Sequence, residues 1–167
     1  MFLQTLLRRN RPFIAAAINL HQAGKIPANS YVLDLDTIQA NARIMADEAR
    51  RLGLQVYAMG KQFGRNPAAF RALAAEGIDR YVAVDMACDR PIHQAGYRVG
   101  HIGHLVQIPR AEALAAAKIK PDYWTVFSHD KAQEASEASG KVNHCQQLLA
   151  RIYAEGDTFY MGHEGGF

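Results

Sequence analysis

Short apolar segments alternate with helix-like segments along most of this 167-residue chain, and this alternation constrains the fold more than any other feature. Apolar runs rich in β-branched and aromatic residues predict five strands, at residues 55–59, 81–85, 104–108, 123–127 and 158–161. Segments with helical spacing predict helices between them, at residues 67–76, 88–95, 111–118, 131–140 and 146–153. This order is typical of α/β proteins, in which right-handed helical crossovers join parallel strands.

A leader segment precedes this series of strands and helices. Apolar and acidic residues alternate over residues 31–36, which predicts a short strand. Thr37 is then a candidate cap for a helix over residues 38–52, and Gly53 is suited to end that helix.

Two architectures accommodate parallel strands in this order: an open doubly wound sheet and a (β/α) barrel. Neither a Gly-x-Gly-x-x-Gly fingerprint nor a P-loop follows any predicted strand, which argues against a nucleotide-binding doubly wound sheet. A complete barrel has eight strands in typically about 250 residues, whereas only five are predicted here. We therefore predict a partial (β/α) barrel of the α/β class.

The N-terminal residues do not follow the strand–helix pattern. Apolar residues recur at helical spacing over residues 5–23, which predicts one amphipathic helix ended by Gly24. We expect residues 1–28 to form a helical extension and residues 29–167 to form the first portion of the barrel domain.

Composition narrows the class of protein. Hydrophobic residues make up 49% of the chain and charged residues 21%, as in a soluble globular domain, and the net charge of +3 is scattered rather than gathered into a basic stripe. We expect no nucleic-acid partner. The two cysteines have no metal-binding spacing, and no apolar stretch approaches 18 residues, so we expect a cytoplasmic protein with reduced thiols, no signal peptide and no membrane span.

Polar residues follow each predicted strand, where a barrel places its reacting groups. In chain order these residues are Lys61, Asp85, Gln107, Ser128 with His129, and His163 with Glu164. Because strands commonly end where polarity begins, this coincidence by itself is only moderately informative.

Lys61 has the most specific chemistry of this set. Met59 and Phe63 offer apolar neighbours that would strip water from the amine, which lowers the pKa of a lysine and favours its attack on an aldehyde. Gly60 and Gly64 leave space for a flat ring beside it. The alternative is an ordinary solvated loop lysine.

The other polar residues leave alternatives open. Gln107 is either a satisfied buried amide or a cofactor contact. His163 and Glu164 lie in a glycine-rich loop, where they form either a ring-stacking and hydrogen-bonding pair near a cofactor or a flexible turn. His101 and His104 suggest a metal only weakly because no further ligands accompany them, and we expect no metal.

Residues Ser30–Asp36, with Asn41 five residues later, resemble the opening of the alanine racemase-like family, which uses pyridoxal 5′-phosphate (PLP) on a fold-type III barrel. In that family, which includes D-threonine aldolase-like and D-serine dehydratase-like members, the first barrel strand ends in the PLP-binding lysine. Lys61, in the phrase Tyr-Ala-Met-Gly-Lys, occupies that place. The resemblance is closer still to the YhfX-type branch of this family, through residues 81–86, 103–110 and 156–167.

The resemblance implies that PLP is the cofactor, that Lys61 forms the Schiff base with it, and that the same amine moves a proton at Cα. The expected reaction is racemisation of an amino acid, with little activity from these 167 residues alone. The alternatives are another fold-type III reaction, such as D-amino-acid aldol cleavage, dehydration or decarboxylation, and a non-catalytic PLP-binding module. The expected partner is a small amino-acid substrate, and no membrane is expected to be bound. A homodimer is one possible state of the full-length form.

The chain departs from the family pattern in two respects. Gln-Phe-Gly-Arg follows Lys61, where alanine racemases proper have Ala-x-Ala-Tyr-Gly, so L-alanine is not the expected substrate. In the family, the groups that hold the PLP phosphate and supply the opposite-face base come from later segments, and nothing in this chain matches them.

Overall fold

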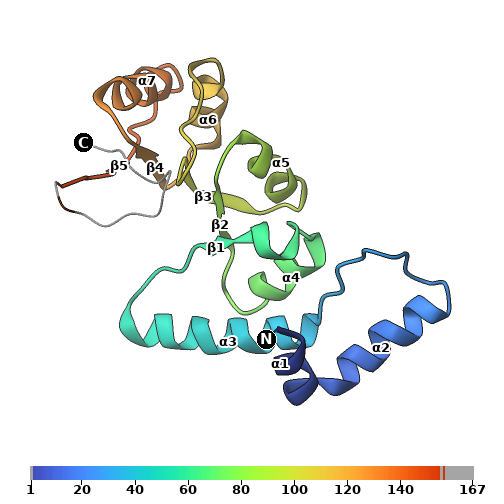
Figure 1. Cartoon of the computed structure of the whole chain (residues 1–167). Coiled ribbons are helices and arrows are strands. Elements are labelled where there is room, and N and C mark those ends of the chain that lie inside the picture. Colours follow the sequence, from blue (N-terminus) through green and yellow to red (C-terminus); the bar gives the residue numbers. More distant parts are fainter. Residues whose placement is uncertain (1, 155, 157–167) are drawn as a thin grey trace.

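A computed structural model of the chain describes residues 2–154 and 156. Its centre is a five-stranded parallel sheet with the strand order β1-β2-β3-β4-β5, so each strand pairs with its neighbour in the sequence (Figure 1). The strands are β1 (Ala58–Met59), β2 (Arg80–Ala83), β3 (Arg98–Ile102), β4 (Tyr123–Val126) and β5 (Leu148–Ala150). Sequential parallel order is that of a (β/α) barrel wall, and it confirms the predicted fold class.

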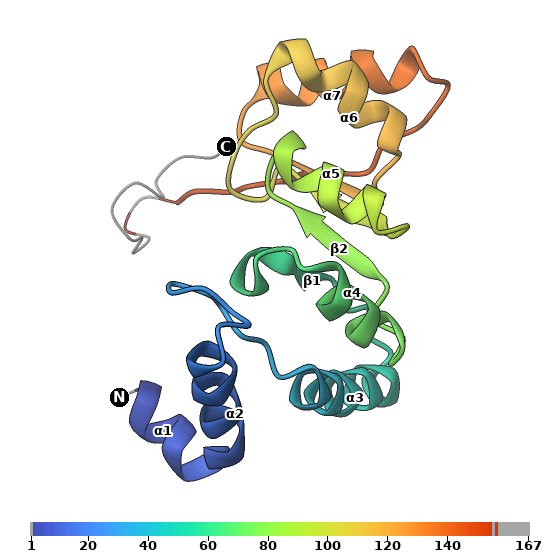
Figure 2. The same ribbon diagram turned by 90° about the vertical axis from the view of Figure 1, so that its right-hand side faces the viewer.

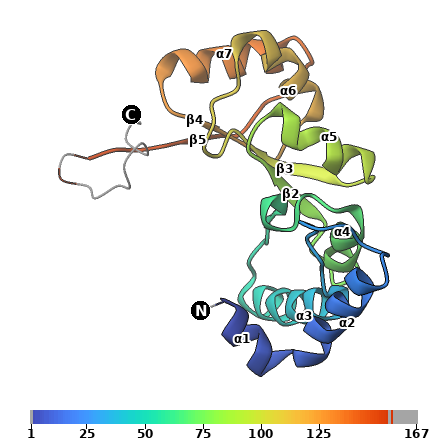
Figure 3. The ribbon, with the colours of Figure 1, turned by 45° about the vertical axis from the view of Figure 1, so that its right-hand side comes forward.

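A helix follows each of the first four strands and returns the chain to the start of the next strand. These helices are α4 (Pro67–Ala74), α5 (Met86–Gln94), α6 (Ala113–Ile119) and α7 (His129–Gly140). The short 3-10 helices η1 (Gly60–Phe63) and η2 (Arg110–Glu112) precede α4 and α6. Helices α5, α6 and α7 lie together on one side of β3, β4 and β5 (Figure 3).

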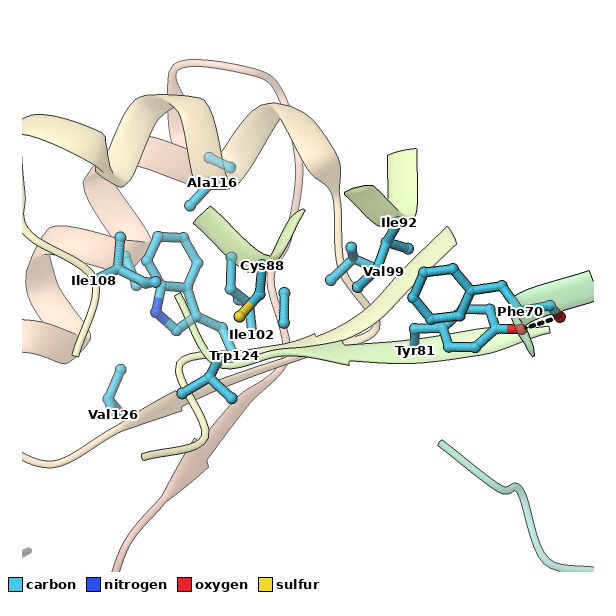
Figure 4. Packing of buried hydrophobic residues seen from close by; sticks show 14 of the residues in the cluster. Phe70, Tyr81, Cys88, Ile92, Val99, Ile102, Ile108, Ala116, Trp124 and Val126 are labelled. Atoms are coloured by element: carbon cyan, nitrogen blue, oxygen red, sulfur yellow. Dashed lines mark hydrogen bonds between the residues drawn. The ribbon is translucent and has the colours of Figure 1, made fainter. Parts of the chain in front are cut away.

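The core lies between the sheet and these helices (Figure 4). At the β2 end, the rings of Phe70 and Tyr81 meet edge to face with centroids 4.5 Å apart, and the Tyr81 hydroxyl donates to the Phe70 carbonyl oxygen at 2.9 Å. At the β4 end, Trp124 packs among Ile102, Ile108 and other apolar side chains. Burial of these side chains on one face fixes which face each strand turns toward the helices.

A register shift marks the pairing of β2 with β3. Tyr81 pairs with Val99 and Val82 pairs with His101, so Gly100 is an extra residue in β3. A Cβ atom at Gly100 would lie 2.3 Å from the Tyr57 ring, so only glycine fits here. The bulge was not predicted from the sequence.

The helix predicted over residues 38–52 was correct at its end and wrong at its start, because Asp34 and not Thr37 is the cap. Gly53 ends α3 (Leu35–Leu52) in the left-handed conformation, as predicted. Asn66, Asp85 and Ser128 each begin a helix by accepting a hydrogen bond from a backbone N–H of its first turn.

The predictions for the N-terminal third were partly wrong. The alternating residues 31–36 do not form a strand, because Leu35 already belongs to α3 and Asp34 caps it through the backbone N–H of Thr37 at 2.9 Å. The single N-terminal helix is two helices, α1 (Phe2–Arg9) and α2 (Arg11–Gln22), with Asn10 capping the second (Figure 2). The Asn10 side-chain amide also donates a hydrogen bond to the Asp34 carboxylate at 2.5 Å. The domain boundary predicted after residue 28 stays a prediction.

Two strand and helix assignments further along were also wrong. The apolar run 104–108 is a loop, and the third strand is β3, which lies before it. Residues 148–150 form β5 rather than part of a helix over 146–153. The predicted strand over 158–161 lies outside the described residues.

Among residues 2–154, no helix is both long enough and apolar enough to cross a membrane.

Candidate functional site

The carboxyl ends of the five parallel strands lie along one edge of the sheet, and this edge carries most of the predicted site residues. Lys61 follows β1, Asp85 follows β2, and Ser128 follows β4. In parallel α/β folds ligands bind at this edge because the loops that follow the strands converge there.

Lys61 lines a pocket of about 500 Å³ at the end of β1. The other walls come from η1 and from the leader segment that precedes α3, which contributes Tyr31 and Leu33. The Lys61 side chain is exposed, and no hydrogen bond or ion pair to another described residue engages its Nζ. The amine is therefore accessible. The sequence predicted that apolar neighbours would remove water from this amine, but the described residues leave it exposed.

The backbone that carries Lys61 is held tightly against the core. Gly60 is buried, and a Cβ atom there would lie 2.9 Å from the Phe70 ring. Phe63, at the other end of η1, meets the same ring edge to face, with centroids 5.3 Å apart. These contacts fix the turn of backbone on either side of the amine.

A second anchor follows η1. Gly64 and Arg65 both adopt the left-handed backbone conformation, with φ of 62° and 55°. The Arg65 guanidinium donates to the Sγ of Cys88 at 2.9 Å, which ties the Lys61 loop to the first turn of α5. A Cβ atom at Gly64 would meet nothing within 4 Å, so space is open beside this loop.

Asp85 and Ser128 serve as helix caps. Asp85 accepts a hydrogen bond from the Cys88 backbone N–H at 2.8 Å. Burial raises the pKa of Asp85, but the hydrogen bonds from Cys88, the positive charge of Arg65 and a hydrogen bond from the Ala87 backbone together leave the pKa below its usual value. Ser128 accepts from the Lys131 backbone N–H at 3.3 Å, and His129 is the first residue of α7.

His101 in β3 is half-buried, and its Nε2 lies 2.6 Å from the Thr125 hydroxyl in β4. The His104 ring lies 5.4 Å away between centroids. Burial, and then the neighbouring His104, lower the pKa of His101, so the neutral imidazole is favoured. Residues 2–154 contain no group of three or more His, Cys, Asp or Glu side chains placed to hold a metal ion.

Gln107 lies in the loop after β3, not in a strand. Its Nε2 donates to the carbonyl oxygens of Thr125 at 3.3 Å and of Gly103 at 3.5 Å, and its Oε1 accepts from the Phe127 backbone N–H at 3.0 Å. All three contacts brace the ends of β3 and β4. Of the two alternatives for Gln107, this geometry favours the satisfied amide.

The remaining predicted pair, His163 and Glu164, lies outside the described residues. Sequence reasoning missed Tyr31, Arg65 and Thr125. Arg65 and Thr125 each contact a residue distant in the sequence, and Tyr31 lines the Lys61 pocket from the leader segment. No local pattern signals such long-range arrangements.

No sequence profile of a known protein family matches the chain. The chain is 42% identical over all 167 residues to the uncharacterised protein YhfX of Escherichia coli strain K12. It spans 43% of the length of that protein.

Among solved structures, the chain is similar to D-threonine aldolase from Filomicrobium marinum, with a TM-score of 0.63 at 19% identity. The match covers 80% of this chain and 36% of the aldolase. At this identity the similarity shows a shared fold, the parallel α/β architecture described above.

Proposed function

We propose that this chain is the lysine-bearing portion of a PLP-dependent amino-acid racemase-like enzyme, with Lys61 as the residue that binds the cofactor covalently. The observation that carries the proposal is the position of Lys61: an accessible amine on a rigid turn directly after the first parallel strand, beside a pocket of about 500 Å³. A pocket of this size is in the range of small-molecule and cofactor sites.

The residues present fit such a cofactor. The amine of Lys61 is free of ion pairs among the described residues, which a group that condenses with an aldehyde requires. Space beside Gly64 is open, and Phe63 offers an apolar wall. The resemblance of the leader segment and of the first strand to PLP enzymes of fold-type III supports the same assignment.

Lys61 would have two tasks in this reaction. Its Nζ would hold the cofactor, and after exchange with the substrate the freed amine would accept or return the proton at Cα. When bound, PLP draws electrons away from Cα and so makes that proton acidic. The contacts of Gly60 and Phe63 with Phe70 would keep the amine in a fixed place during proton transfer.

A titration with PLP followed by absorbance tests the assignment. Wild-type chain should develop a saturable absorbance change that free PLP lacks, and Lys61→Gln should lose it. Lys118→Gln, at an exposed lysine on α6, is the matched control and should behave as wild type. Equal spectra for wild type and Lys61→Gln would overturn the proposal.

A second candidate reaction is aldol cleavage of a D-amino acid. It is suggested by the resemblance to a family with several activities and by the fold shared with a D-threonine aldolase. Incubation of the PLP-loaded protein with a panel of D- and L-amino acids separates the two. Racemisation inverts the substrate without changing its mass, whereas aldol cleavage releases an aldehyde and a smaller amino acid. An absence of both products, with PLP bound, would favour a non-catalytic PLP-binding module.

A further inference from the structure

A charged cluster occupies the edge of the sheet opposite Lys61, where the strands begin. Asp122, just before β4, accepts hydrogen bonds from the Arg80 guanidinium, from Arg98 at 2.6 Å and from the Tyr57 hydroxyl at 3.1 Å. Its partners precede or open β1, β2 and β3, so one carboxylate joins the starts of four adjacent strands.

The hydrogen bonds that join the strands through Asp122 leave the cluster with a net positive charge. Asp122 is the single carboxylate that the two guanidinium groups share among the described residues. Each guanidinium has five N–H donors and uses one of them on Asp122, and Arg80 also has a side-chain hydrogen bond with the Tyr57 hydroxyl. The side chain of Arg98 is 56% exposed, so its remaining donors face solvent.

These groups surround a pocket of about 330 Å³. Lys120 lines it as a third cation, and no described residue pairs with its side chain. Tyr57 and Tyr123 form an aromatic wall, with ring centroids 6.0 Å apart. The pocket thus combines a concave shape, surplus positive charge and an apolar wall, which are the features of a site for a small organic anion.

We propose that this pocket binds a small molecule with a carboxylate or phosphate group. The free N–H donors of Arg80 and Arg98 match the paired oxygens of either group, and Lys120 adds a mobile point charge. The site lies at the opposite end of the strands from Lys61 and does not depend on the chemistry proposed there.

Cys145 supplies a built-in reporter, because it lines this pocket and is exposed, whereas Cys88 is buried. The rate at which the neutral reagent iodoacetamide alkylates Cys145 is followed by intact mass and peptide mapping. Inorganic phosphate and succinate are compared with chloride at equal ionic strength. An occupied pocket covers the thiol, so we expect either or both oxyanions to slow its alkylation several-fold in the wild-type chain.

Three variants assign the effect to the pocket. Protection should be lost in Arg98→Gln and weakened in Lys120→Gln, and retained in Lys118→Gln, whose side chain does not line this pocket. Because Lys120 is exposed and has no described partner, its variant should fold even if loss of the Arg98 brace destabilises the chain. Protection by one oxyanion only identifies the group that the site prefers. Equal rates in phosphate, succinate and chloride, or equal protection in wild type and Lys120→Gln, would overturn the proposal.

Discussion

At the scale of single residues, the position of Lys61 depends on neighbours that carry no chemistry. Gly60 allows the backbone to approach Phe70, whose ring is fully buried and is surrounded by the rings of Phe63, Tyr81 and Tyr97. Because that ring has no room to shift, the close approach at Gly60 fixes the start of η1.

Gly60→Ala should therefore destabilise the chain. The added methyl group would lie 2.9 Å from a Phe70 ring carbon, and overpacking of this kind costs roughly 1–3 kcal/mol in the free energy of unfolding. Urea denaturation measures the change. Gly140→Ala is the matched control, because its Cβ atom would meet nothing within 4 Å and alanine favours a helix. A Gly60→Ala variant as stable as Gly140→Ala would contradict the packing described for η1.

The place of Lys61 just after the first strand was predicted correctly from the sequence. An apolar run followed by a lysine between two glycines is a pattern that neighbouring residues alone define. The sequence did not predict the surroundings of Lys61. The pocket needs Tyr31 from the leader segment, and the loop needs Arg65 to reach Cys88, which lies 23 positions further along the chain. Such contacts are set by the packing of whole helices and strands, which residue patterns do not encode.

At the scale of elements, Asp34 decides where the longest helix begins. Its carboxylate accepts from the backbone N–H of Thr37 at 2.9 Å and from its hydroxyl at 2.7 Å. The backbone hydrogen bond from Thr37 is the main reason that the pKa of Asp34 is lowered.

Asp34→Ala should lower the free energy of unfolding by about 1 kcal/mol, because α3 loses its cap. Asp34→Asn, whose side-chain oxygen can still accept from Thr37, should retain most of the stability. Thermal or urea unfolding of the two variants gives the comparison. Equal losses in both variants would show that the charge of Asp34, and not the cap, supports this helix.

Glu76 links α3 to the end of α4 and gives this contact a pH dependence. Hydrogen bonds from Arg43 and Gln39 lower its pKa to about 2. A depressed carboxylate pKa contributes stability that is fully present above the ordinary glutamate value of 4.5 and is lost as the pH falls toward 2. We expect wild type to be more stable than Glu76→Gln by a constant margin above that value.

The margin should then shrink as the pH falls through this window. Unfolding midpoints measured for both proteins across the acid range test the expectation. A margin that is the same at every pH would mean that the Glu76 carboxylate is not the titrating group.

Two short apolar segments, 104–108 and 148–150, have a different secondary structure from the one predicted. In the apolar run 104–108, Leu105 and Val106 are 42% and 47% exposed, whereas β3 contains Gly100 and His101, which interrupt its apolar pattern. Residues 148–150 pair with β4 although the spacing of apolar residues around them is also helical. Short apolar runs suit either structure, and the neighbouring strand decides between them. Longer patterns with caps, such as α4 and α7, were predicted correctly.

At the scale of the whole molecule, the parallel sheet has two edge strands among the described residues, β1 and β5. Large apolar side chains are also exposed on α1 and α2, including Leu3 and Ile18 at 59% and 50%. Unpaired strand edges and exposed apolar surface favour association between chains.

We therefore predict that the 167-residue chain self-associates or is poorly soluble. Sedimentation velocity over a range of protein concentrations should show species larger than a monomer, and their fraction should increase with concentration. A monodisperse monomer with a single cooperative unfolding transition would contradict this prediction.

Covalent binding of PLP by Lys61 can be measured directly on the protein. Borohydride reduction of the chain with sub-stoichiometric PLP, followed by peptide mapping, measures the occupancy of each lysine directly. We predict that the reduced label is concentrated on Lys61, with little on exposed lysines such as Lys25 and Lys118. A label spread evenly over the exposed lysines, or absent from Lys61, would contradict the proposed role of Lys61.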